Sequence, residues 1–545
     1  MAYLIADYLV DRLAQHGVDR IFGVPAVFCA AVFDAAGRKA GFGTVVTNSD
    51  LEAGYAADGY GRIHGLSALA VSYGPGNLSV VNAIAGAYLE RSPVVIISGG
   101  PSQKNIDDQN ATGVLYSHSM GKPHTDLDVF SNITAFCQRE TDETKIPQLI
   151  DDALRAALVT KHPVYLEAPK DLFNRPCSPP AAPIDTTVPA GAADAVATTI
   201  LQELKSATNP VVVVGEEVQR YGVAADVLTV LDRLQLRWAT TVVGKAVLLE
   251  QHPRFIGVFN GDKAPAPLRN AIAQAGLIVA LGAVFGSGHA ALMIPRADRT
   301  IRAWDGIAVI RGGATQAVGL PALVDRLDSQ SVGATPIVYD TPMPAADGQQ
   351  AVVPAAELGY QQVVDVVAES AFLDASFRVI ADTFLGIYPA ARMTMPAQDS
   401  FIACAQWASI GHSVGAAVGA WSPGGKRPLV LIGDGGFQMV GQAVSTMVRY
   451  QHNSIVIIID NSLYGFEQYL LGPGYYTNPA QAPLSYNVLP DWDFDAFAQS
   501  LGVTQVATAT TVTELRAALA AAKAHAGGPS VIRAMVAGRS LPAGL

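Results

Sequence analysis

The sequence predicts an α/β protein of three consecutive domains, each a parallel sheet covered by helices. Short apolar segments alternate with helical ones along all 545 residues, and these segments are continuously apolar, as in strands buried on both faces. Two stretches without periodicity, 176–194 and 329–354, are rich in Pro, Gly, Ala and polar residues and are typical of linkers. We therefore expect domains at residues 1–175, 195–330 and 355–545.

The predicted elements follow this order along the chain. A first helix is indicated by apolar residues at helical spacing from Leu4 to Leu13, with Gly17 just past its end. The predicted strands of the first domain are 44–47, 68–73, 94–98 and 164–168. In the second domain they are 211–214 and 277–281, and in the third 429–432 and 455–459.

Composition and charge exclude several classes of function. The 36 Lys and Arg residues against 47 Asp and Glu give a net charge of −11, which disfavours nucleic-acid and anionic-membrane partners. The apolar runs stop far short of a membrane span, and the N-terminus lacks the pattern of a signal peptide, so we expect a cytoplasmic protein. Only 15% of residues are charged while 50% are hydrophobic, which favours burial in cores and subunit contacts. The four cysteines form no CxxC pair and predict neither a zinc site nor a disulfide framework.

The most informative motif is Gly-Asp-Gly-Gly at 433–436, directly after a predicted strand. The next apolar strand ends in Asp-Asn-Ser-Leu at 460–463, so Asp434 and Asn461 are 461 − 434 = 27 residues apart and should meet at one sheet edge. Asp434, the Asn461 side-chain carbonyl and a backbone carbonyl, that of Leu463, make an oxygen set suited to Mg²⁺ bound to phosphate. The alternative is a plain strand-to-helix turn in which Asn461 caps a helix.

This motif and several others resemble those of thiamine diphosphate enzymes of the pyruvate and indolepyruvate decarboxylase group. The matching segments, in chain order, are IADYL at 5–9, FGVP at 22–25, YAADGY at 55–60, ADT at 381–383, WASIG at 407–411, GDG at 433–435 and YGFE at 464–467. The resemblance implies a pyrimidine-binding domain, a central domain and a diphosphate-binding domain. It also implies active sites shared between subunits, and hence a homodimer or homotetramer.

The resemblance further implies which residues hold thiamine diphosphate and Mg²⁺. In the family a bulky aliphatic residue wedges between the two rings of the cofactor, and Ile410 occupies that position. The implied cofactor-binding residues are Asp50, Thr383, Ala408, Ile410, Gly433, Asp434, Gly435, Gly436, Asn461, Leu463, Tyr464 and Gly465. A flavin or second nucleotide in the central domain stays open.

A carboxylate that faces the pyrimidine N1′ is also implied. Counting back eight residues from Asp58 gives Asp50, one methylene shorter than the family's Glu. Glu52 lies nearby, but residues two apart on a helix do not share a face, so we assign this role to Asp50. The alternative is that Asp50 only caps a helix over 51–63.

Two more catalytic residues match the family, and several positions depart from it. His118 matches the second His of the family's His-His pair, and Glu467 matches its active-site Glu, which we expect to be protonated in an enclosed pocket. The family's Asp is replaced by Val27, beside Phe28, and its first His by Ser117. Phe384 and Leu385 replace small polar residues and suggest an apolar pocket wall.

These departures predict the reaction's outcome. Because the groups that protonate the enamine are missing, we expect an enzyme that decarboxylates a 2-oxo acid and couples the enamine to an acceptor aldehyde or keto acid, forming an acyloin. The alternatives are a plain decarboxylase that releases aldehyde, a C–C lyase or hydrolase, and an inactive regulatory paralogue.

Overall fold

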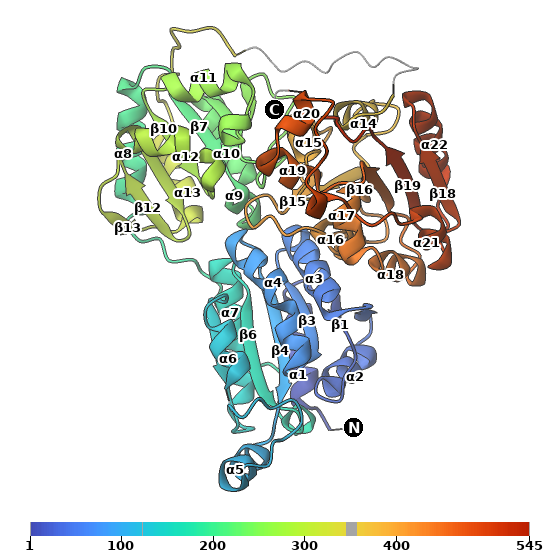
Figure 1. Ribbon diagram of the computed structural model, residues 1–545. Helices are drawn as coiled ribbons and strands as arrows, with labels where there is room; N and C mark the ends of the chain where they lie inside the picture. The colour runs from blue at the N-terminus through green and yellow to red at the C-terminus, as the bar shows by residue number, and fades with distance from the viewer. Residues whose placement is uncertain (1, 123, 345–356, 544) are drawn as a thin grey trace. The chain divides into compact units, whose positions relative to one another are not determined.

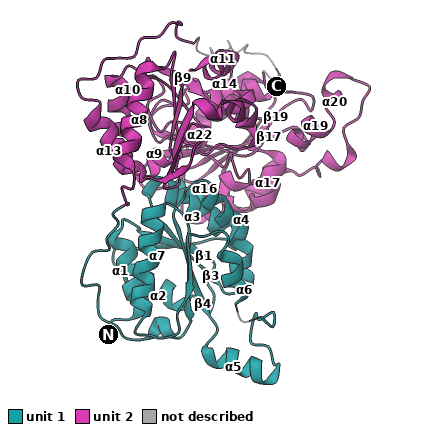
Figure 2. Ribbon diagram, turned by 90° about the vertical axis from the view of Figure 1, so that its left-hand side faces the viewer, with its two compact units in different colours: residues 1–187, 418–420 teal, residues 188–417, 421–545 magenta. Residues whose placement is uncertain are grey.

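The computed structural model of the chain describes residues 2–122, 124–344, 357–543 and 545 (Figure 1). It divides into two compact units, Met1–Thr187 with Val418–Ala420, and Val188–Ala417 with Trp421–Leu545 (Figure 2). The first unit contains one sheet and the second contains two, so the predicted α/β class with three helix-covered sheets is confirmed. Among the described residues, no helix combines the length and the apolar character needed to cross a bilayer.

The first unit is built on a six-stranded sheet in which every pair is parallel. In sheet order its strands are β2 (Gly43–Val46), β1 (Arg20–Gly23), β3 (Ser67–Ser72), β4 (Val94–Gly100), β6 (Val164–Pro169) and β5 (Phe136–Arg139). Helices α1 (Ile5–Gln15), α2 (Ala30–Arg38) and α7 (Ile146–Thr160) cover one face, and α3 (Asp50–His64), α4 (Pro75–Leu89) and α6 (Thr125–Phe130) the other (Figure 2). Two further helical segments are α5 (Gln103–Thr112) and the 3₁₀ turn η1 (Leu172–Asn174).

The first sheet of the second unit has seven strands. In sheet order they are β13 (Thr315–Ala317), β12 (Ile307–Ile310), β11 (Thr300–Trp304), β10 (Ile278–Leu281), β7 (Val211–Val214), β8 (Arg237–Thr240) and β9 (Phe255–Val258). Its helices are α8 (Ala193–Ser206), α9 (Glu216–Arg220), α10 (Ala224–Arg233), α11 (Ala266–Gln274), α12 (Ala290–Met293) and α13 (Leu320–Gln330), with 3₁₀ turns η2 (Gly261–Lys263), η3 (Ser287–His289) and η4 (Ile294–Arg299).

One edge of this sheet differs from the all-parallel prediction. β12 runs antiparallel to both β11 and β13. The cause is local, because Asp305 and Gly306 both have positive φ (53° and 70°), the conformation of a two-residue hairpin turn. The Asp-Gly pair between two apolar segments was the sequence signal for this hairpin.

The second sheet of this unit again has six parallel strands. In sheet order they are β15 (Phe401–Ala403), β14 (Phe377–Ala381), β16 (Arg427–Gly433), β17 (Ile455–Asp460), β19 (Ser530–Met535) and β18 (Gln505–Ala509). Its helices are α14 (Tyr360–Val367), α15 (Ile387–Arg392), α16 (His412–Ala420), α17 (Asp434–Val440), α18 (Ala443–Arg449), α19 (Gly465–Leu471), α20 (Gly474–Thr477), α21 (Phe494–Ser500) and α22 (Val512–Ala524), with the 3₁₀ turn η5 (Ser485–Asn487).

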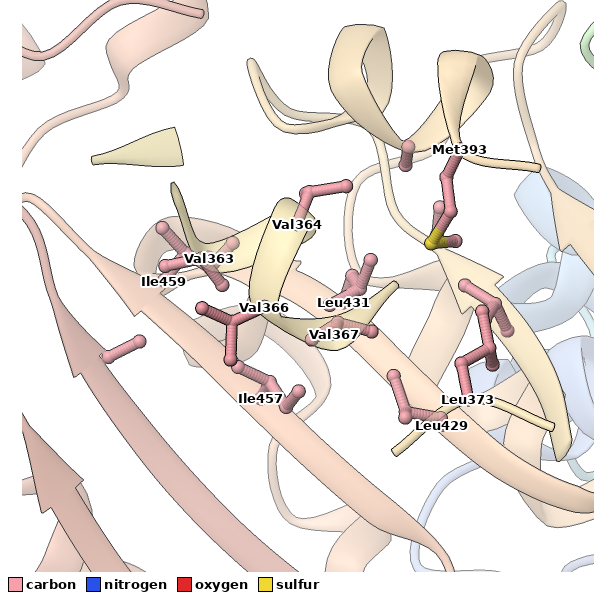
Figure 3. Close-up of a cluster of buried hydrophobic side chains, with 14 of the residues drawn as sticks. Val363, Val364, Val366, Val367, Leu373, Met393, Leu429, Leu431, Ile457 and Ile459 are labelled. Carbon is pink, nitrogen blue, oxygen red and sulfur yellow. The ribbon is translucent and has the colours of Figure 1, made fainter. Parts of the chain in front are cut away.

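The core beside this sheet fixes β16 and β17 in place. Leu429 and Leu431, like Ile457 and Ile459, alternate along their strands and point to the same face (Figure 3). They pack in one buried cluster with valines of α14 such as Val366. Burying each such side chain contributes roughly 1.5–3 kcal/mol, so the ends of these two strands are held rigidly.

The predicted linkers agree in part with the structure. Between η1 and α8 the chain forms no helix or strand, as expected for 176–194. In the second linker α13 continues to Gln330, whereas residues 345–354 lie outside the described part of the chain. Residues 355–356, where the third domain is predicted to begin, and residue 1 also lie outside it.

Candidate active site

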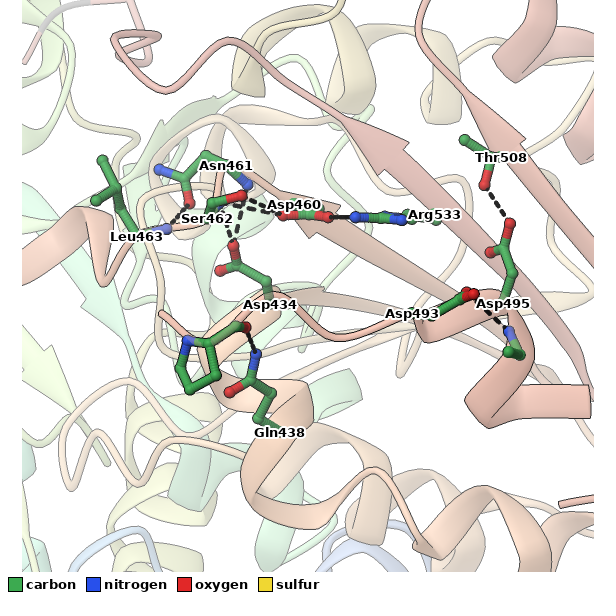
Figure 4. A network of polar contacts seen from close by, with 12 residues as sticks. Asp434, Gln438, Asp460, Asn461, Ser462, Leu463, Asp493, Asp495, Thr508 and Arg533 are labelled. Carbon is green, nitrogen blue, oxygen red and sulfur yellow. Dashed lines mark hydrogen bonds and ion pairs between the residues drawn. The ribbon is translucent and has the colours of Figure 1, made fainter. Parts of the chain in front are cut away.

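The carboxyl ends of β16 and β17 bring the predicted metal residues together. The strands are paired in parallel with Gly433 opposite Ile459, so Asp434 and Asn461 follow at the same sheet edge. One carboxylate oxygen of Asp434 accepts the backbone N–H groups of Asn461 (3.1 Å) and Ser462 (2.6 Å; Figure 4). The other oxygen accepts the N–H of Gly435 (2.9 Å). The Asp434 carboxylate therefore ties the two strand ends together.

The charges around Asp434 are unbalanced in a way that suits a cation. Burial, together with the nearby carboxylate of Asp460, raises the pKa of Asp434 to about 7. Asp460 is already paired with Arg533 (2.6 Å; Figure 4), so the two neighbouring carboxylates of Asp434 and Asp460 have one guanidinium between them. A divalent cation would supply the missing positive charge and favour the ionised form of Asp434.

The other predicted metal ligands fit the same cation. The side-chain oxygen of Asn461 accepts the N–H of Leu463 at 3.3 Å, while its Nδ2 is buried without a hydrogen-bond partner among the described residues. The carbonyl of Leu463 accepts the N–H of Gly465 (2.7 Å) and keeps a second lone pair. No cluster of three His, Cys, Asp or Glu side chains suited to a metal occurs in the described ranges, so a cation here would need amide and backbone oxygens in addition to the Asp434 carboxylate.

Glycines leave room beside these groups. A Cβ on Gly435 would lie 2.5 Å from the ring of Tyr464, and one on Gly436 would lie 3.3 Å from Ile410. A side chain at either position would therefore press on a residue that the sequence assigned to the cofactor. The arrangement brings Gly435, Gly436, Ile410 and Tyr464 together beside Asp434.

The loop that carries Ile410 is held by a carboxylate to which the sequence analysis assigned no role. Asp382, at the end of β14, accepts the backbone N–H groups of Gly411 (3.0 Å) and Ser413 (2.9 Å). Gly411 and Ala408 both have positive φ (90° and 58°), so this loop has a sharply bent backbone. The available signal was the Ala-Asp-Thr segment itself, since an acid that follows a buried strand lies at the ligand edge of the sheet.

Four further residues expected around cofactor and substrate lie in the second unit. Phe384 and Leu385 are buried in its hydrophobic core cluster, where they pack against apolar neighbours. Thr383 donates to the carbonyl of Cys404 (3.2 Å). Glu467, in the first turn of α19, is exposed, so this unit alone does not provide the enclosed pocket expected for its carboxyl group.

In the first unit, Asp50 lies at the start of α3. The cap of this helix is Ser49, whose side chain accepts the N–H of Glu52 at 3.2 Å, so the alternative that Asp50 is the cap is wrong. The Glu52 side chain is fully buried and accepts the N–H of Asn48 (3.0 Å), which gives it a structural task. Partial burial raises the pKa of Asp50, against a lowering effect of its own backbone N–H.

The remaining residues expected at the substrate lie near the turn after β3. The His118 ring lies 5.3 Å from that of Phe28, and His118 has a φ of 66°, an uncommon conformation for a residue with a side chain. Val27 is 66% exposed, and Ser117 is also exposed. A Cβ on Gly74 would lie 2.8 Å from His118, so only glycine fits there.

A second carboxylate that the sequence analysis missed supports this turn. The buried Asp126 accepts the N–H of Gly74 (2.9 Å) and an amide N–H of Asn77 (2.7 Å). Burial raises the pKa of Asp126, and these two hydrogen bonds lower it. No sequence pattern links residue 126 to residue 74, which are far apart along the chain.

The chain matches three family descriptions in the expected order. Residues 4–124 match "Thiamine pyrophosphate enzyme, N-terminal TPP binding domain", 197–304 match its "central domain" and 386–534 its "C-terminal TPP binding domain". Fold and site therefore define a thiamine diphosphate-dependent enzyme.

Curated relatives cover nearly the whole chain. It is 32% identical to "Indole-3-pyruvate decarboxylase" of Azospirillum brasilense, over 98% of this chain and 95% of that protein. It is 31% identical to "Alpha-keto-acid decarboxylase" of Mycobacterium avium (96% and 92%) and 29% identical to "Pyruvate decarboxylase" of Hanseniaspora uvarum (91% and 88%). The chain belongs to the family of thiamine diphosphate-dependent 2-oxo acid decarboxylases.

Proposed function

We propose that the protein uses thiamine diphosphate and Mg²⁺ to decarboxylate a 2-oxo acid and to join the product to an acceptor aldehyde or keto acid, forming an acyloin. The observation that carries the decarboxylase part is the buried Asp434 carboxylate, which joins the ends of β16 and β17 and has a raised pKa that a cation would reverse. The proposed domains are residues 1–175 for the pyrimidine, 195–330 as central domain and 355–545 for the diphosphate.

The residues of the second unit would hold the diphosphate and its metal. Asp434, Asn461 and the carbonyl of Leu463 would bind Mg²⁺, while Gly433, Gly435 and Gly436 let the diphosphate approach the backbone. Ala408, Ile410, Thr383, Tyr464 and Gly465 would contact the remainder of the cofactor. When bound, thiamine diphosphate supplies a nucleophilic carbon and accepts the negative charge left as CO₂ departs.

Asp50 would hold a proton against the pyrimidine nitrogen N1′. Partial burial already favours the protonated carboxyl, which can then share its proton with a ring nitrogen. Ser49 caps α3, and Glu52 accepts the N–H of Asn48, so neither of these contacts requires Asp50.

His118 and Glu467 would handle protons near the substrate, beside Val27, Phe28, Ser117, Phe384 and Leu385. Val27 and Ser117 lack the acid and the imidazole that would protonate the decarboxylated product, and this supports coupling to an acceptor. Both His118 and Glu467 are exposed in one chain. We propose that a second copy covers them in a homodimer or homotetramer, with the pyrimidine domain of one subunit facing the diphosphate domain of another.

A product analysis tests this function. The full chain with thiamine diphosphate and Mg²⁺ is incubated with aliphatic and aromatic 2-oxo acids, with and without excess acceptor aldehyde, and CO₂, aldehyde and acyloin are measured. We expect CO₂ with each accepted acid, and more acyloin than aldehyde when acceptor is present. Mainly aldehyde would refute the coupling and leave plain decarboxylation, the activity named for the relatives above. Absence of CO₂ with every acid would refute the decarboxylase.

The metal site has its own test. Asp434→Ala should abolish Mg²⁺-dependent binding of thiamine diphosphate, measured by calorimetry, without loss of secondary structure. Asp491→Ala, at an exposed residue, is the matched control and should bind normally. Unchanged affinity in the Asp434 variant would refute the assignment.

A further inference from the structure

A cavity of about 450 Å³ lies in the central domain, on the hairpin edge of the β7–β13 sheet. Thr300, Arg302 and Trp304 alternate along β11 and so point to one face of the sheet, and Val309 of β12 is paired directly with Arg302. Met293 of α12 lines the cavity from another element. The volume is in the range of pockets that bind small organic molecules.

The lining is mostly apolar, with the polar side chains of Ser287, His289 and Thr300 and one charge, that of Arg302. Phe285, Trp304, Met293, Ile294 and Val309 supply aromatic and aliphatic surface, and Ile294 is 73% exposed at the rim. The buried His289 is engaged by the backbone, since its Nδ1 accepts the N–H of Gly286 at 3.3 Å and its Nε2 lies 3.1 Å from a carbonyl oxygen. Burial lowers the pKa of His289 and keeps the ring neutral.

The single charge, Arg302, has no anion of its own. Its guanidinium carbon lies 3.9 Å from the centre of the Trp304 ring and 4.9 Å from that of Phe285. Across the described ranges, no carboxylate pairs with Arg302 and no acceptor meets its buried Nε–H. A guanidinium stacked on aromatic rings keeps its N–H groups at its edge, where a carboxylate can accept two parallel hydrogen bonds.

We infer that this cavity is a second ligand site, which binds an organic monoanion composed of a carboxylate and an apolar or aromatic body. The carboxylate binds Arg302, and the body lies on Phe285, Trp304 and Met293. One guanidinium matches one carboxylate, and the apolar lining matches the remainder of such a molecule. The inference does not depend on the proposed reaction, because none of the proposed cofactor or substrate residues lines the cavity.

The test titrates the full chain, loaded with thiamine diphosphate and Mg²⁺, with 3-phenylpropionate and follows binding by calorimetry. Phenylpyruvate in a parallel titration shows whether a 2-oxo acid or a simple carboxylate is preferred, and 3-phenylpropionamide serves as a neutral analogue. We expect saturable binding of at least one acid. The amide should bind at least roughly tenfold more weakly than that acid, because it loses a charge-assisted hydrogen bond. No saturable binding of either acid, or equal binding of the amide, would overturn the inference.

Protein variants locate the site. Arg302→Met removes the charge but keeps a long, unbranched apolar chain in place of the methylene groups of Arg, and it should weaken acid binding roughly tenfold or more. Arg326→Met, at an exposed position of α13 with only distant ion pairs, is the matched control and should bind like the wild type. Unchanged affinity in Arg302→Met would place the ligand elsewhere and refute the site. The amide comparison decides the question if Arg302→Met does not fold.

Discussion

In the cofactor-free protein, the Asp434→Asn variant should be more stable than the wild type at alkaline pH and less stable than the wild type at acid pH. Folded Asp434 keeps its proton up to about pH 7, because it is buried and close to Asp460, whereas the unfolded residue loses it near 3.8. Between these values the folded state binds more protons, so the stability that this group contributes falls as the pH rises.

The magnitude follows from this interval. At about 1.4 kcal/mol per pH unit, ionising Asp434 in the folded state costs on the order of 4 kcal/mol above pH 7. Asn removes this cost, but it offers one oxygen to the three backbone N–H groups that Asp434 accepts, a loss of roughly 1–3 kcal/mol. We therefore expect Asp434→Asn to be about 1–3 kcal/mol more stable than the wild type at pH 8 and less stable at pH 5.

The assay compares thermal unfolding of wild type and variant with chelator present. Glu167 and Glu216, whose pKa values burial raises to about 7, titrate in both proteins, so only the difference between them reports on Asp434. Adding Mg²⁺ and thiamine diphosphate at pH 8 should stabilise the wild type and not the variant. A stability difference that is the same at pH 5 and pH 8 would refute the raised pKa and the argument for the metal built on it.

Three further predictions concern other parts of the site. Asp50→Asn should abolish turnover while Glu52→Gln mainly lowers the melting temperature, and the reverse pattern in kinetics and thermal unfolding would exchange their roles. Asp382→Asn should raise the Kd for thiamine diphosphate roughly tenfold, because one of two backbone N–H groups loses its acceptor, and an unchanged Kd would separate Asp382 from the site. Val27→Asp combined with Ser117→His should shift products from acyloin to aldehyde, roughly 10²-fold at most, as measured by chromatography; an unchanged ratio would show that these positions do not control protonation.

The sequence was sufficient to predict the strands β16 and β17, and that Asp434 and Asn461 meet at one sheet edge, for a physical reason. Residues 429–432 and 455–459 are continuously apolar because helices cover both faces of their sheet, so their ends could be located from composition alone. Glycines and an acid at such an end point to a ligand edge, and this placed Asp434 and Asn461 together.

What the sequence did not predict depends on contacts between distant segments. Asp382 supports Gly411, and Asp126 supports Gly74, through side-chain to backbone hydrogen bonds that have no periodic pattern. An apolar residue next to a ligand edge can point either into a pocket or into the core, so the sequence alone did not place Phe384 and Leu385 in the core cluster where they lie. The hairpin at Asp305, by contrast, had a recognisable local signal.

The proposed site residues of the two units differ in how firmly the structure holds them, and this difference separates cofactor affinity from product choice. In the second unit, hydrogen bonds fix Asp434 and the loop after Ala408, so the cofactor would bind groups that need little ordering. In the first unit, Val27, Ser117 and His118 are exposed. Changes at Asp434 should therefore alter the Kd for thiamine diphosphate, whereas changes at Val27 or Ser117 should alter the ratio of products and leave that Kd unchanged.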